Sequence, residues 1–224
     1  MRNGCLITGT TLIAVHTYHE VVIAADTKLR KVGNPEARDS GRAHRIGDVG
    51  NVFFAAAGLL GDTQGKFNLG RLVTAACDGN PPFLKKVERF STAVQPPLIE
   101  IIQDIKTDHP DYYRSELDNK FVLQMAFGAF ENGRPHLHTL GCKSVYSASS
   151  LEIVNVPSGD SGWVALGQNS EIYKFVGKNP NRLFASGWRI SIEKLIALEA
   201  QQNPDRVALP VDIVHISAAG ATWL

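Results

Sequence analysis

Short apolar runs of β-branched or small side chains mark the first third of the chain. They lie at residues 12–15, 21–25 and 52–56, and polar or turn-forming residues separate them. Runs of this length are typical of buried strands, whereas an amphipathic helix needs a longer pattern with a period of 3.6 residues. We therefore predict three strands here, the first two joined as a hairpin, and a further strand at about 43–46.

The pattern becomes helical in the middle third. Apolar residues recur at helical spacing between residues 61 and 77, which predicts a first helix. Ser91 or Thr92 can cap a second helix that runs to about residue 107, because a side-chain oxygen can accept a hydrogen bond from a free amide of the first turn. We therefore expect two helices after the first strands.

Strands return in the last half of the chain. The runs at 121–130 and 135–140 flank Asn132-Gly133, a dipeptide that tolerates the positive φ angles of a tight hairpin turn. The remaining pattern predicts a strand at 163–166, a helix at 169–176, a helix from Ser191 to about 203 and a strand at 211–216. Blocks of strands and helices in this order favour an α+β fold with antiparallel sheets flanked by helices.

Composition narrows the function by exclusion. The 224 residues carry 23 Lys and Arg against 22 Asp and Glu, a net charge of +1, so the chain as a whole lacks a basic nucleic-acid footprint. The longest uncharged apolar stretch, 52–61, has about half the length that a membrane-spanning helix needs. The first residues do not form a secretory signal, and the three cysteines are scattered without a metal-binding pair. We therefore expect a cytoplasmic protein with no metal, cofactor, membrane or nucleic-acid partner.

A threonine pair before the first predicted strand is the strongest chemical candidate. Gly9, Thr10 and Thr11 precede that strand, Asp26 ends the second one, and a glycine-containing segment at 57–62 ends the strand before the first helix. Each signal is weak by itself. Their occurrence together is what makes Thr10 a candidate.

These segments resemble the proteasome β-subunit family, which includes a related bacterial two-ring peptidase. The matching residues are 8–12, 21–28 and 57–64, and 127–141 look like the middle hairpin of that family. The resemblance implies an Ntn-hydrolase fold, a four-layer αββα sandwich in which two antiparallel sheets lie between helical layers. It also implies a short propeptide at 1–9 and a single domain at 10–224.

The resemblance further implies that cleavage between Gly9 and Thr10 makes Thr10 the first residue of the working enzyme. The Thr10 hydroxyl would attack a peptide carbonyl while its own α-amine, with a pKa of about 7.7–8.0, accepts the proton. In the uncleaved chain this nitrogen is an amide and cannot act as a base. Asp26 would orient the site with support from Thr11, and the Gly58 amide would stabilise the oxyanion.

One departure from the family pattern concerns the cation of the site. Arg42 stands where the family has a lysine, sixteen residues after Asp26. An arginine can supply positive charge beside Thr10, but with a pKa above about 12 it cannot shuttle a proton. The segment that follows is a residue or two longer than usual, so His44 or Arg45 could take this place instead.

Further departures concern the supporting residues. Gln168 stands where the family has a serine. Asp205 corresponds to a later aspartate of the family, but Ala208 falls where the serine partner of that aspartate would be. By the same resemblance, the first specificity pocket is lined by Leu29, Ser40, His44, Ala56 and Leu60.

Three functions remain open at this point. The first is a self-processed threonine endopeptidase that assembles from identical subunits into stacked rings, cleaves peptides or unfolded proteins in an inner chamber, and could be fed by an ATPase unfoldase. The second is a catalytically reduced ring subunit with a scaffold or binding role, which the substitutions at 42, 168 and 208 suggest. The third is an Ntn amidase that acts on small amides through the same threonine.

Overall fold

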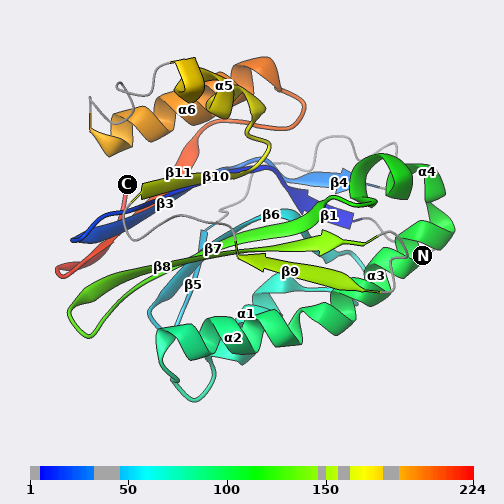
Figure 1. The fold of residues 1–224 in the computed structure, drawn as a ribbon, viewed down its shortest axis with the longest axis horizontal. Coiled ribbons are helices and arrows are strands. Elements are labelled where there is room, and N and C mark those ends of the chain that lie inside the picture. Colours follow the sequence, from blue (N-terminus) through cyan, green and yellow to red (C-terminus); the bar gives the residue numbers. More distant parts are fainter. Residues whose placement is uncertain (1–5, 33–45, 146–149, 156–161, 179–186) are drawn as a thin grey trace.

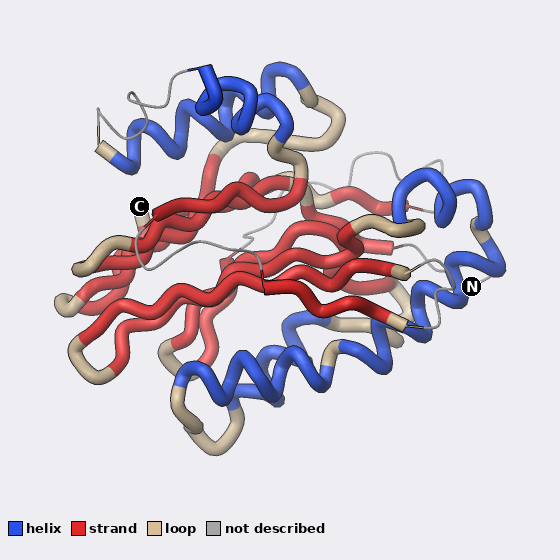
Figure 2. Tube along the Cα trace, viewed as in Figure 1, coloured by secondary structure: helices blue, strands red, loops and turns tan. Residues whose placement is uncertain are grey.

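Two antiparallel sheets pack face to face, and helices cover both outer sides (Figure 1). The computed structural model describes residues 6–32, 46–145, 150–155, 162–178 and 187–224. The tube view separates the four layers: a helical pair, the smaller sheet, the larger sheet and a second group of helices (Figure 2). The α+β sandwich expected from the sequence is confirmed.

The larger sheet has seven strands in the spatial order β4-β1-β6-β7-β8-β9, with β5 also paired to β6. Its strands are β1 (Leu6–Gly9), β4 (Arg30–Val32), β5 (Ile46–Val49), β6 (Val52–Asp62), β7 (Phe121–Glu131), β8 (Arg134–Ser144) and β9 (Leu151–Asn155). The smaller sheet has five strands in the order β10-β2-β3-β11-β12. These are β2 (Thr11–His16), β3 (Glu20–Asp26), β10 (Gly162–Gly167), β11 (Val211–Ser217) and β12 (Gly220–Trp223).

The helices form the two outer layers. Against the larger sheet lie α1 (Leu69–Cys77), α2 (Phe83–Ala93) and α3 (Gln95–Asp108), followed by the short α4 (Pro110–Tyr112) and a π-helical turn (Tyr113–Leu117). Against the smaller sheet lie α5 (Ser170–Lys178) and α6 (Trp188–Gln202). None of the helices in the described part of the chain is both long enough and apolar enough to cross a membrane.

Small and medium aliphatic side chains fill the layer between the two sheets. Leu12, Ile23, Ala126 and Val214 belong to this cluster and are fully buried. Gly128 on β7 keeps the sheets close, because a Cβ there would lie 3.0 Å from methyl groups of both β3 and β11. At the other end of this layer Thr10, directly before β2, lies close to Ala57 of β6, since a Cβ at Gly167 would contact both residues.

Larger side chains fill the two outer cores. Phe90, Ile102 and Phe127 belong to the core between the larger sheet and α1–α3. Ile172 and Ile196 pack against the smaller sheet from α5 and α6. The stripe of apolar residues on α3 is buried at Leu98, Ile101, Ile102 and Ile105, as its helical spacing predicts.

Most of the predicted elements exist, but three helices begin at other residues than predicted, and the segment between β6 and β7 has one more long helix than expected. The helix expected within 61–77 begins at Leu69, because β6 continues to Asp62 and Asn68 caps the helix by accepting from the Arg71 amide. Ser91 and Thr92 cap nothing. They lie inside α2, where their hydroxyls donate back to the Glu88 carbonyl, and α3 begins at Gln95 before two prolines. The middle block therefore has three long helices where two were expected.

The last long helix also begins earlier than expected. Its first residue is Trp188, directly after Gly187, whose φ of 89° suits glycine. Ser191 thus lies in the first turn and does not cap it. Strands β4, β9 and β12 were missed, whereas the hairpin of β7 and β8 turns at Asn132-Gly133 with φ angles of 52° and 74°, as predicted.

The strand β1 is the unexpected element of the fold. Residues 6–9 were expected only as a propeptide, yet Leu6–Gly9 is a strand of the larger sheet, paired with β4 on one side and β6 on the other. The next strand, β2, belongs to the smaller sheet. The chain therefore crosses from one sheet to the other at Thr10, which is not part of either strand.

The outer core yields a stability prediction. Replacing the fully buried Ile102 by alanine leaves a cavity beneath the larger sheet and is expected to lower the free energy of unfolding by about 2–5 kcal/mol. Replacing the neighbouring exposed Gln103 by alanine should change it by less than about 0.5 kcal/mol. Urea unfolding of the two variants and the parent measures both values, and equal effects would contradict the packing described here.

Candidate active site

Thr10 lies at the crossing between the sheets with its side chain against a buried carboxylate. Its Oγ1 is 2.9 Å from both carboxylate oxygens of Asp26, so the hydroxyl hydrogen points between them. Thr10 is 7% exposed and Asp26 is fully buried. The nucleophile and the aspartate proposed from the sequence are thus in direct contact.

Backbone amides from three further segments converge on Asp26. Its Oδ1 accepts from the Thr11 amide at 2.9 Å. Its Oδ2 accepts from the Lys28 amide at 3.1 Å and from the Ala208 amide at 3.4 Å. An ionised carboxylate is a pure acceptor, and burying one is tolerable only where donors surround it. The arrangement therefore suits a charged Asp26 that keeps Thr10 in place.

The backbone of Thr10 is held by the end of β10. The Gln168 amide donates to the Thr10 carbonyl at 2.7 Å, and the Thr11 hydroxyl donates to the Gln168 carbonyl at 2.7 Å. Gly167 makes this approach possible, because a Cβ there would lie 1.8 Å from the Thr10 carbonyl oxygen. Two supporting residues expected from the sequence, Thr11 and Gln168, thus bond to each other and flank Thr10.

The Gln168 side chain points away from Thr10 toward a buried glutamate. Its Nε2 lies 3.2 Å from Glu199 Oε1, which also accepts from Asn203 Nδ2 at 2.6 Å. The other oxygen of this fully buried carboxylate accepts from the Glu171 and Ile172 amides, in the first turn of α5. Glu199 therefore joins α5, α6 and the end of β10, and it stabilises a helix N-terminus that has free donors.

Gly58 faces Thr10 from the larger sheet. It pairs with Gly9 in the β1–β6 ladder and has a φ of 95°. A side chain would clash here, since a Cβ would lie 2.3 Å from the Val122 carbonyl oxygen. The backbone at Gly58 thus lies directly opposite the Gly9–Thr10 junction, as an oxyanion donor for that peptide bond would have to.

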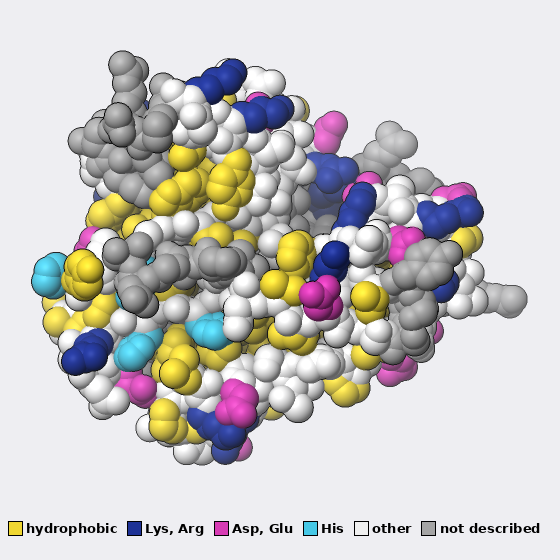
Figure 3. Space-filling view, viewed as in Figure 1, with side chains coloured by type: hydrophobic (Ala, Val, Ile, Leu, Met, Phe, Trp, Pro, Cys, Tyr) yellow, Lys and Arg dark blue, Asp and Glu magenta, His cyan; other side chains and the backbone are white. Residues whose placement is uncertain are grey.

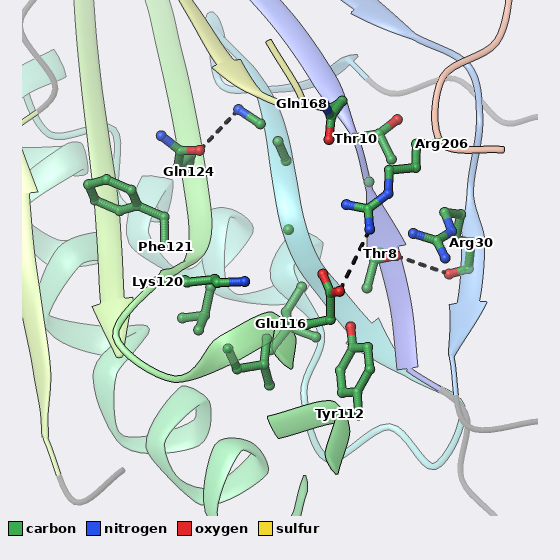
Figure 4. Close-up of a pocket in the computed structure, with 17 residues that line it drawn as sticks. Thr8, Thr10, Arg30, Tyr112, Glu116, Lys120, Phe121, Gln124, Gln168 and Arg206 are labelled. Carbon is green, nitrogen blue, oxygen red and sulfur yellow. Dashed lines mark hydrogen bonds and ion pairs between the residues drawn. The ribbon is translucent and has the colours of Figure 1, made fainter. Parts of the chain in front are cut away.

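A cavity of about 330 Å³ opens beside this junction. Thr8, Gly9 and Thr10 form one wall, and Gly58, Leu59 and Gln124 form part of another. Gln124 accepts from the Gly167 amide at 3.0 Å and so links β7 to the end of β10 (Figure 4).

The mouth of the cavity carries charge of both signs. Arg30 on β4, Lys120 before β7 and Arg206 after α6 line it, and Glu116 pairs with Arg206 at 3.7 Å (Figure 4). In the space-filling view, Lys and Arg side chains gather between the α5–α6 layer and α4, with acidic side chains beside them (Figure 3). Burial raises the pKa of Tyr112 above its ordinary value, with Glu116 acting in the same direction and the two arginines opposing it.

Several residues proposed from the sequence lie elsewhere. Ser40, Arg42 and His44 fall outside the described residues. Asp205 lies in an exposed turn, and within the described structure no hydrogen bond joins its side chain to the site; the nearby Ala208 amide reaches Asp26 instead. Leu29 is half-buried between β3 and β4.

The pocket residues expected on β6 face the helices. Ala56 belongs to the outer core below the larger sheet, and Leu60 packs against the same core. The residues of β6 that line the cavity are Ala57, Gly58 and Leu59.

Sequence reasoning missed several residues of the site. Gln124 is a polar residue within the apolar run of β7, and Glu199 stands four residues after Leu195 on the apolar stripe of α6. A polar residue at a position where the pattern calls for an apolar one is a usable signal of a buried hydrogen bond. The charged residues at the cavity mouth carried no such signal, because they come from segments far apart in the chain.

The two antiparallel sheets between helical layers, crossed by the chain at a threonine, form an α+β sandwich of the αββα type. A solved structure with a similar fold is the Anbu (Gly-1) mutant from Hyphomicrobium sp. strain MC1. The match has a TM-score of 0.55 and 13% sequence identity, and it covers 96% of this chain and 85% of that chain. At this identity the likeness shows the fold alone. No protein-family model matches the sequence, and no curated protein matches it.

The close approach at Gly167 gives a prediction. Alanine at this position would place its Cβ 1.8 Å from the Thr10 carbonyl oxygen, so Thr10 must move away from Asp26 or the protein must unfold. We expect Gly167→Ala to lower the free energy of unfolding by more than about 3 kcal/mol.

Gly65 provides the matched control for this substitution. Its φ of 76° is nearly that of Gly167, 77°, but nothing lies within 4 Å of a Cβ there. Gly65→Ala should therefore show only the backbone strain, about 1–2 kcal/mol. Denaturant unfolding of both variants decides the matter, and a Gly167→Ala protein no less stable than the control would rule out the contact.

Proposed function

We propose that the protein is a threonine-type endopeptidase of the proteasome β-subunit type that cleaves its own chain between Gly9 and Thr10. The observation that carries the proposal is the Thr10 hydroxyl, 2.9 Å from the buried Asp26 carboxylate at the point where the chain crosses between the sheets. The Thr10 hydroxyl belongs to the same Gly9–Thr10 junction that lies opposite Gly58, and this proximity is what an intramolecular attack on the Gly9 carbonyl requires.

The first step of the proposed chemistry is processing. Thr10 Oγ1 attacks the carbonyl carbon of Gly9, the bond from that carbon to the Thr10 nitrogen breaks, and the nitrogen takes a proton to become a free amine. An ester between Gly9 and the Thr10 side chain results. Water then hydrolyses this ester, which releases the preceding residues as a carboxylic acid and leaves Thr10 with both a hydroxyl and an α-amine.

The second step repeats this chemistry on a separate peptide. The Thr10 amine accepts the hydroxyl proton as Oγ1 attacks the substrate carbonyl, and the same proton passes to the leaving amine before water hydrolyses the acyl-enzyme. Because the base must be neutral, the rate should rise with pH through the pKa of the α-amine, about 7.7–8.0 in an unperturbed amine. Asp26 orients Thr10, the Gly58 amide stabilises the oxyanion, and Arg42 supplies positive charge.

The pairing of β1 supports an extended peptide as substrate. Residues 6–9 run antiparallel to both β4 and β6 and end at the bond that would be cleaved. Once β1 has left, these two strands would present free backbone groups on both sides of a gap, which a second extended peptide can fill by strand addition. We further propose that identical subunits assemble into stacked rings around the sites and that unfolded proteins, delivered by an ATPase unfoldase, are the substrates.

Intact mass of the purified protein tests the proposal. We expect the observed mass to match a chain that begins at Thr10, and a proteasome-type epoxyketone to label that residue. Thr10→Ala should retain all preceding residues and lower peptide cleavage by roughly 10⁴-fold or more, because it removes the attacking oxygen.

Thr10→Ser is the matched control, since it keeps a hydroxyl and so should keep processing at a reduced rate. A parent protein that retains the residues before Thr10 and resists the epoxyketone would exclude the proposed peptidase. Cleavage of small acyl amides but not of casein would favour the Ntn amidase instead.

A second candidate function is a catalytically reduced ring subunit. The observation in its favour is that Leu6 is 2% exposed and that β1 is paired along both edges, so an uncleaved chain would cover its own site. Arg42 in place of lysine and Gln168 in place of serine would fit such a role.

Arg42→Lys separates the two candidates. If the site is intact but lacks a group that can exchange a proton, the lysine should raise peptide cleavage at least about tenfold, measured as kcat/KM on one fluorogenic peptide. Arg134→Lys, at an exposed position on the β7–β8 turn, is the matched control and should have no such effect. An unchanged rate in Arg42→Lys would show that the arginine does not limit the chemistry.

A further inference from the structure

The cavity beside the Gly9–Thr10 junction contains more positive than negative charge. Arg30, Lys120 and Arg206 reach it, against the single carboxylate of Glu116 among its described lining residues. Glu116 is engaged with Arg206 at 3.7 Å, and Lys120 Nζ donates to the Ser115 carbonyl. In the described structure no hydrogen bond or ion pair engages the Arg30 guanidinium. The contact between Arg30 and the Thr8 hydroxyl uses the Arg30 backbone carbonyl, which accepts. An anionic group could therefore bind here without displacing an existing ion pair.

Thr8 is the residue of β1 that faces this charge. It lies directly opposite Arg30 in the β1–β4 ladder, and side chains at opposed positions of an antiparallel pair project to the same face. Its short side chain lines the cavity but does not fill it, and its hydroxyl makes only a long 3.5 Å contact with the Arg30 carbonyl. The cavity is thus large enough for a longer side chain at this position.

We infer that the cavity is a specificity site for an acidic side chain at the second residue before the cleaved bond. The inference rests on the proposed function, because it treats β1 as occupying the place of the substrate, with Gly9 and Thr8 as the first and second residues before that bond. A glutamate at the Thr8 position would lie beside Arg30 and within reach of Arg206, which can bind a carboxylate through paired N–H donors.

The first test is made within the chain and does not depend on catalysis. In a Thr10→Ala background, which prevents processing, Thr8→Glu and Thr8→Gln place side chains of equal size in the cavity. We expect the Glu variant to melt about 2–4 °C above the Gln variant in low salt, the size typical of a partly exposed ion pair in a chain of this length. The difference should shrink at about 1 M salt, where charges are screened beyond about 3 Å.

Arg30→Gln provides the control for this pair. It should remove most of the difference between Glu and Gln at position 8, whereas Arg134→Gln, on the exposed β7–β8 turn, should leave the difference intact. A Glu variant no more stable than the Gln variant overturns the inference, even if both variants are destabilised relative to Thr8.

The second test uses two peptides that differ only by Glu or Gln two residues before the cleaved bond. The processed protein should cleave the Glu peptide with a kcat/KM roughly threefold to tenfold higher, and Arg30→Gln should abolish the preference. Equal rates overturn the inference and leave the proposed peptidase standing. If neither peptide is cleaved while Glu at position 8 still stabilises the chain, the proposed function fails and an anion-binding cavity remains.

Discussion

The contact between the Thr10 hydroxyl and the Asp26 carboxylate is the interaction on which the rest of the site depends. A fully buried carboxylate is costly unless donors surround it. Here the donors are the backbone amides of Thr11 at the start of β2, Lys28 just after β3 and Ala208 after α6. Those three segments must therefore meet at one point. The narrow core between the sheets allows this, because the small residue Ala57 on β6 lies against Gly167 of the opposite sheet at the crossing.

The same crossing makes the uncleaved chain the occupant of its own site. Because β1 and β2 lie in different sheets, the peptide between them must pass the buried carboxylate, and β1 must fill the place between β4 and β6. A strand that is paired on both sides and lies next to the proposed nucleophile has the backbone contacts of a bound extended peptide. In the proposed peptidase, folding and substrate binding would thus use the same hydrogen-bonding groups, and only the continuity of the chain would distinguish the two.

Sequence reasoning succeeded where the pattern is local. The strands at 12–15 and 21–25 and the Asn132-Gly133 hairpin follow from short apolar runs and turn chemistry. The association of Asp26 with Thr10 was implied by the resemblance to proteasome β subunits. Sequence reasoning failed where the outcome depends on contacts between distant segments. Ser91 is a residue type typical of helix caps, but the two prolines after Gln95 place the start of α3 there and leave Ser91 inside α2. The seven-stranded sheet required residues 6–9, which no local pattern distinguished from a leader.

Gln168 shows how a substitution can change the chemistry of a site and preserve its geometry. Its contacts with Thr10 and Thr11 use its backbone amide and carbonyl, which any residue other than proline supplies, whereas its side chain points toward Glu199. Exchanging a serine for glutamine at this position therefore removes a hydroxyl near Thr10 without releasing the Thr10 backbone. The buried Glu199 accepts the extra amide donor and ties it to the first turn of α5. In the proposed peptidase, this departure from the family pattern would therefore alter proton transfer and leave the placement of Thr10 unchanged.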